Sequence, residues 1–146
     1  MTPPFDTSGN LPPGIHRADW PEFVNRYTYN ERRRTLAGGL LEALILLKLA
    51  GCKAVYVDGS FVASKAIPGD FDACWELDGV NLEVLDPVFL RFEAGAASLT
   101  ERFSGQLFPV LASSILRSED FFDFFSRDRQ TRKPKGIISV NLESLP

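Results

Sequence analysis

The chain has few of the residues on which thiol, histidine and metal–sulfur chemistry depend. Its 146 residues include one histidine, His16, and two cysteines, Cys52 and Cys74. Two cysteines are too few for a disulfide scaffold or a four-cysteine zinc site, and a single histidine further limits metal chemistry. The class of function that these absences leave open is chemistry carried by carboxylates.

The sequence also lacks an excess of positive charge and a long apolar run. Sixteen Lys and Arg stand against 19 Asp and Glu, a net charge of −3 that argues against a general DNA-binding protein. The longest strongly apolar stretch, residues 36–50, is short for a bilayer span and contains Glu42 and Lys48. The start of the chain does not have the layout of a signal peptide. We therefore expect a cytoplasmic protein with no membrane partner.

The composition predicts one folded domain preceded by an arm. Apolar residues make up 45% of the chain, which is enough for one hydrophobic core at this length. Residues 1–14 carry four prolines and are predicted to form an N-terminal arm that is ordered only by docking. Residues 15–146 are predicted to form the single domain.

Helix and strand patterns alternate along that domain. A helix is predicted over residues 20–27 after a cap at Asp19, and a long one over residues 31–50, between a cap at Asn30 and a terminating Gly51. Further helices are expected at 96–114 and 118–129 and strands at 54–57, 70–76 and 137–142, with 81–92 ambiguous. The order predicts an α/β fold, with a small mixed sheet and helices packed mainly on one face.

The most informative motif consists of Gly59-Ser60, nine further residues and Asp70-Phe71-Asp72. A Gly-Ser turn after a strand exposes N–H groups and a hydroxyl to which a phosphate can bind. Two carboxylates at i and i+2 on a strand point to the same side, with Cβ atoms roughly 6–7 Å apart. That spacing suits a divalent cation such as Mg²⁺, which neutralises nucleotide phosphates.

This arrangement resembles the core motif of the nucleotidyltransferase superfamily related to DNA polymerase β. The resemblance covers residues 31–76, and the chain looks like a minimal stand-alone member of the kind found in bacterial toxin–antitoxin and defence loci. It implies that Gly59 and Ser60 contact the triphosphate of an NTP and that Asp70 and Asp72 hold Mg²⁺. The implied reaction moves a nucleoside monophosphate to a hydroxyl of a protein or an RNA.

Enzymes of that superfamily normally add a third carboxylate from a later strand, and the sequence leaves its identity open. Glu143 follows Asn141 by two residues at the end of the last predicted strand and is the candidate catalytic residue. The alternatives are Glu76, Asp86 and Glu83. Lys65 lies in the loop of the motif and is a candidate phosphate contact, although a solvated loop lysine is the commoner case.

Two other functions use the same fold without catalysis. The chain can be a binding module, one partner of a toxin–antitoxin pair, or a nucleotide sensor without turnover. The candidate interface with a cognate protein is the phenylalanine-rich stretch 121–125 with a basic cluster of Arg127, Arg129, Arg132, Lys133 and Lys135. A run of three arginines, Arg32-Arg33-Arg34, is expected to lie on a solvated helix face.

Overall fold

The computed structural model describes residues 2–91, 93–111 and 135–146, with the backbone alone for residues 93–96. Three features that the sequence predicts lie outside the described residues. They are the helix at 118–129, the phenylalanine-rich stretch 121–125 and the basic cluster except Lys135. The elements, in chain order, are β1 (Ile15–Asp19), α1 (Trp20–Tyr27), α2 (Glu31–Leu49), β2 (Val55–Asp58), the 3₁₀ turn η1 (Gly59–Val62), β3 (Phe71–Glu76), η2 (Pro87–Leu90), α3 (Glu93–Phe103), β4 (Gly105–Val110), β5 (Ile137–Asn141) and η3 (Leu142–Ser144).

The five strands form one mixed sheet in the order β1-β5-β2-β3-β4. The central strand β2 is antiparallel to both of its neighbours, β5 and β3. The outer strands are parallel to the strands beside them, β1 to β5 and β4 to β3. The end of β2 therefore lies at the edge of the sheet where β3 and β4 begin, and the ends of β1 and β5 lie at the opposite edge.

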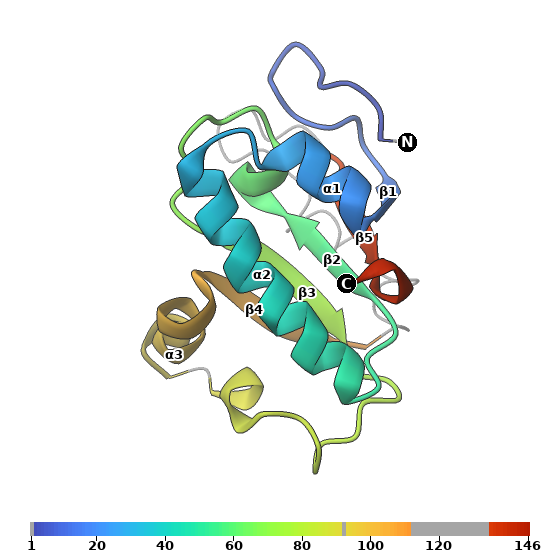
Figure 1. Ribbon diagram of the computed structural model, residues 1–146, viewed down its shortest axis with the longest axis vertical. Helices are drawn as coiled ribbons and strands as arrows, with labels where there is room; N and C mark the ends of the chain where they lie inside the picture. Colours follow the sequence, from blue (N-terminus) through green and yellow to red (C-terminus); the bar gives the residue numbers. More distant parts are fainter. Residues whose placement is uncertain (1, 92, 112–134) are drawn as a thin grey trace.

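One face of the sheet carries the hydrophobic core, and α1 and α2 lie over that face (Figure 1). Strand β3 alternates as the sequence predicts, with Phe71, Ala73 and Trp75 at most 2% exposed within this core. Because successive side chains of a strand point to opposite faces, Asp72, Cys74 and Glu76 lie on the other face. The polar half of the motif thus faces away from α1 and α2.

Local signals in the sequence determine helix α2. The Asn30 side chain accepts a hydrogen bond from the Arg33 amide at 2.9 Å, which is an N-cap contact. Gly51 has φ of +92°, the left-handed conformation that terminates many helices. The predicted helix is confirmed. Asp19 occupies the N-cap position of α1 but makes no capping hydrogen bond, because its side chain accepts from Asn141 instead.

The helix predicted over 96–114 is wrong from Ser104 to Leu111, and residues 112–114 lie outside the described residues. Ser104 has φ of +69°, which ends α3, and Gly105–Val110 forms β4 alongside β3. Gly105 is required there because a Cβ atom would lie 2.5 Å from the Phe71 ring. The sequence also did not predict β1, a five-residue strand at the other side of the sheet. Both missed strands lie at the ends of the strand order.

The N-terminal arm docks on the domain. Leu11 is 1% exposed, and its carbonyl accepts a hydrogen bond from the Gly136 amide at 2.8 Å. Gly9 accepts one from the Ser64 amide, also at 2.8 Å, and the Phe5 ring lies beneath the Arg26 guanidinium at 4.5 Å. The arm therefore contacts both the loop after η1 and the start of β5. Of the helices that the structure describes, none is long and apolar enough to cross a membrane.

Candidate functional site

The two halves of the Gly-Ser/Asp-x-Asp motif lie against each other where β2 ends. Gly59 has φ of +77°, in the left-handed region that glycine adopts without steric cost. A Cβ atom at Gly59 would lie 2.6 Å from Oδ2 of Asp72. Glycine is therefore required at this position both for its backbone conformation and for the close approach of the Asp72 carboxylate.

A row of three polar residues crosses the sheet beside Gly59. Asp58 on β2 is the register partner of Asp72 on β3, and Asp72 is the partner of Gln106 on β4. Asp58 is only 5% exposed. Asp58 lies one residue beyond the strand predicted over 54–57, was expected in the turn that follows it, and was not predicted as a site residue. The feature of the sequence that could have identified Asp58 as a site residue is its position directly before Gly59-Ser60.

The Cys74 thiol lies close to both of these carboxylates. The Cys74 thiol is 4% exposed and lies two residues from Asp72 on the same face of β3. Its pKa is raised, first by burial and then by the negative charges of Asp58 and Asp72. Cys74 is therefore held as the neutral thiol and is not an activated nucleophile.

The remaining predicted residues of the motif lie on or beside these elements. Asp70 directly precedes β3 and is half-buried, so the strand itself places only Asp72 of the pair. Ser60 is half-buried in the first turn of η1. Lys65 is exposed in the loop that joins η1 to β3, where its backbone carbonyl accepts hydrogen bonds from Arg33.

Arg33 is the residue at this site that the sequence analysis placed wrongly. It was expected on a solvated helix face, but it is 0% exposed. Burial lowers the pKa of its guanidinium, which donates to the backbone carbonyls of five residues. The available signal was helical spacing, because Arg33 precedes Leu36 and Leu40 on the buried face of α2 by three and seven residues.

Glu76 and Asp86 are engaged in contacts of their own. The Tyr56 hydroxyl donates to Glu76 Oε1 at 2.7 Å, and Glu76 lies four strand positions from Asp72, about 13 Å along β3. Asp86 accepts from the Val88 amide at 3.0 Å and pairs with Arg102, and these two contacts lower the pKa of its carboxyl. Glu83 is exposed in the loop before η2. The structure brings none of the three to Asp72.

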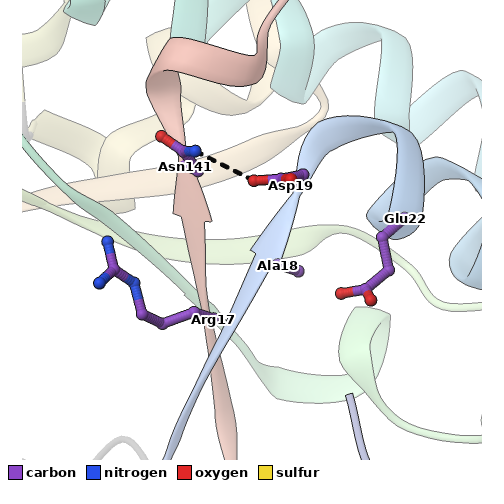
Figure 2. Close-up of a pocket in the computed structure, with 5 residues that line it drawn as sticks. All are labelled: Arg17, Ala18, Asp19, Glu22 and Asn141. Atoms are coloured by element: carbon purple, nitrogen blue, oxygen red, sulfur yellow. Dashed lines mark hydrogen bonds between the residues drawn. The ribbon is translucent and has the colours of Figure 1, made fainter. Parts of the chain in front are cut away.

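Glu143 lies at the opposite edge of the sheet. It follows β5, whose end is at the start of β2, and its amide donates to Asn141 Oδ1 at 3.1 Å. A pocket of about 240 Å³ lies at this edge, lined by Arg17, Ala18, Asp19, Glu22 and Asn141 (Figure 2). Asn141 donates to Asp19, its register partner on β1, at 3.0 Å, and the Arg17 and Glu22 side chains lie on opposite sides of β1 (Figure 2).

These elements define the described part of the chain as a small mixed α/β domain, built on a five-stranded mixed sheet with three α-helices. The chain belongs to a family of unknown function, DUF6932, whose model matches residues 3–141. No curated protein and no solved structure matches it. Within the part that the structure describes, no three or more His, Cys, Asp and Glu side chains are grouped so that they could hold a metal ion.

Proposed function

We propose that this domain is a Mg²⁺-dependent nucleotidyltransferase that moves a nucleoside monophosphate from an NTP to a hydroxyl of a protein or an RNA and releases pyrophosphate. The observation that carries the proposal is the contact between the motif's two halves. Gly59 lies at the position where a side chain would collide with the Asp72 carboxylate. This juxtaposition is what the resemblance to the nucleotidyltransferase superfamily requires of Gly59-Ser60 and Asp-x-Asp.

The donor atoms beside Gly59 fit a hard cation. Asp72 and Asp58 supply carboxylate oxygens from adjacent strands, and Ser60 supplies a hydroxyl. Mg²⁺ prefers oxygen ligands and binds through one or two carboxylates together with substrate phosphates and water. In the proposed site Asp72 and Asp70 hold the ion, with Asp58 beside them. When bound, Mg²⁺ would neutralise charge on the phosphates.

The protein's own contribution is to bind and orient the triphosphate. The first N–H groups of a helical turn have no acceptor within the turn, so the start of η1 offers donors to phosphate oxygens. The left-handed Gly59 followed by the 3₁₀ turn is a conformation in which successive N–H groups form an anion-binding concavity. Ser60 adds a hydroxyl donor at the same place, and Lys65 is the nearby candidate for a positive charge.

Calorimetric titration with each of the four NTPs, in MgCl₂ and in EDTA, tests binding. We expect Mg²⁺-dependent binding that Asp72→Asn removes. Asp78→Asn, which makes the same change of charge at an exposed position in the turn after β3, should leave it intact. Transfer is tested with α-labelled NTPs and cell extract. A folded wild-type protein that neither binds nor transfers any NTP would contradict the proposal.

A second function, a binding module without catalysis, is favoured by one observation. The later strand beside β3 is β4, and the residue that it places opposite Asp72 is Gln106, an amide where the resemblance calls for an acid. Such a module would act as one partner of a toxin–antitoxin pair. The same titrations, together with the transfer assay, distinguish these functions. Mg²⁺-dependent binding without transfer indicates a nucleotide sensor, and absence of metal-dependent binding indicates the binding module.

A further inference from the structure

The loop that joins η1 to β3 is held from inside by one guanidinium. Arg33, in the first turn of α2, donates to the carbonyls of five residues: Tyr27 at 3.2 Å, Phe61 at 2.7 Å, Ser60 at 3.4 Å, Ala63 at 2.9 Å and Lys65 at 2.5 Å and 3.2 Å. Four of these five carbonyls belong to η1 and the loop after it. A guanidinium has five N–H donors in a rigid planar fork, and here Nε, Nη1 and Nη2 all take part.

These contacts fix the direction of the peptide planes. The described part of the chain has no cis peptide bonds, and in a trans peptide the C=O of one residue and the N–H of the next point in opposite directions. When the Ser60 and Phe61 carbonyls point at Arg33, the N–H groups of Phe61 and Val62 point away from it. The Ser64 amide shows this arrangement directly, because the Ala63 carbonyl binds Arg33 while the Ser64 N–H donates to Gly9 at 2.8 Å.

We propose that Arg33 is a positioning residue, which holds the carbonyls of residues 60, 61, 63 and 65 on its own side so that the N–H groups of η1 face a phosphate. This inference rests on the proposed nucleotide-binding function. It assigns to Arg33 no contact with the ligand. The positive charge is buried behind the loop, where the aromatic ring of Phe61 lies 5.3 Å from the guanidinium carbon.

Neighbouring residues of α2 support the same loop further along. The Arg32 guanidinium donates to the carbonyls of Pro68, at 3.1 Å, and Gly69, and Asn30 Nδ2 donates to Ala66 at 2.7 Å. The start of α2 therefore fixes the loop from Ser60 to the residue before Asp70. Arg34 differs from its two neighbours because it is exposed and donates to Thr28, outside the loop, at 3.4 Å.

The three consecutive arginines supply a matched set of variants. Arg33→Lys keeps the charge but offers at most three N–H donors in place of five, so the carbonyls around it lose hydrogen bonds. We expect amide hydrogen exchange in residues 60–69 to accelerate at least tenfold while β3 and β5 change much less. We expect the Kd for Mg-ATP, or for whichever NTP the wild type binds, to rise about tenfold at a temperature where the variant is fully folded. Arg34→Lys should change neither quantity.

The outcomes separate this inference from the proposed function. If the wild type binds no NTP, the proposed function fails and the inference fails with it. If the wild type binds and Arg33→Lys binds equally well, the inference alone is overturned, whatever the change in thermal stability. If Arg33→Lys does not fold, the wild-type protein supplies the second measurement. The Arg33 Nε–H resonance should exchange slowly and shift when Mg-NTP is added, and the absence of a shift on saturation overturns the inference.

Discussion

Replacing Gly59 with alanine tests the candidate site at its closest contact. The backbone at Gly59 has φ of +77°, and holding an alanine in the left-handed region costs about 1–2 kcal/mol. The new Cβ atom would lie 2.6 Å from Asp72 Oδ2 but 3.5 Å from Asp72 Cβ and Cγ. The last two distances are ordinary contacts, so the Asp72 carboxylate can rotate away while its backbone stays in place.

We therefore expect two effects of different size. The free energy of unfolding should fall by about 1–2 kcal/mol, which leaves a domain of ordinary stability folded. Mg²⁺-dependent nucleotide binding should be lost almost completely, because the carboxylate is displaced from its place beside the phosphate-binding turn. Urea unfolding and calorimetric titration of the same protein sample measure the two effects separately.

Gly38→Ala is the control for the first measurement. Gly38 is exposed in the middle of α2, and a Cβ atom there has nothing within 4 Å. This substitution should raise the free energy of unfolding by about 0.5–1 kcal/mol and leave binding unchanged. The reasoning is refuted if Gly59→Ala is as stable as the wild type. It is also refuted if the variant loses stability but binds Mg-NTP with unchanged affinity.

Three further substitutions test the fold around the site. Gly39→Ala should lower the free energy of unfolding by about 3 kcal/mol in urea titrations. The new Cβ atom would lie 1.8 Å from the Phe103 carbonyl oxygen and force α2 and α3 apart. A gain in stability like that of Gly38→Ala would contradict this packing. Asn30→Ala should cost about 1 kcal/mol more than Asn30→Ser, which keeps a cap acceptor and, like alanine, loses the bond to the Ala66 carbonyl, and equal losses would show that the cap is not used. Tyr27→Phe should stabilise the protein by about 1 kcal/mol at neutral pH, because the Tyr27 hydroxyl is buried and has no hydrogen-bond partner among the described residues. Burial raises the pKa of Tyr27 to about 12, above its unfolded value near 10. Ionisation of Tyr27 therefore does not lower the free energy of unfolding below pH 10, and it lowers this free energy as the pH rises from 10 to about 12. Unfolding measured between pH 8 and pH 12 should show a smaller alkaline loss for Tyr27→Phe than for the wild type, and an unchanged loss would contradict the assignment.

The sequence by itself determined the elements that local signals specify. Asn30 and Gly51 mark the two ends of α2, and apolar residues between them recur at helical spacing. β2, β3 and β5 were predictable because each is a short β-branched or alternating run. The pairing of Gly59-Ser60 with Asp72 was also predictable, because the motif spans two strands that are adjacent in the chain and antiparallel in the sheet.

Only the tertiary structure decided the remaining features of the site. β1 and β4 owe their conformation to the strands beside them, and β4 even contains Pro109, which is poor in a central strand but tolerated in one at the end of a sheet. Glu143 was placed near the motif by its position after the last strand, but β5 runs antiparallel to β2 and carries it to the opposite edge.

Arg33 shows the physical reason most clearly. In the sequence it carries the same charge as Arg32 and Arg34, and only helical spacing separates it from them, because it precedes Leu36 and Leu40 on the buried face of α2 by three and seven residues. Its burial depends on four carbonyls of η1 and the loop after it, which point at Arg33 only when these segments have folded over the start of α2. Hydrogen-bonding partners that come from separate segments cannot be predicted from one segment, because they exist only after the chain has packed.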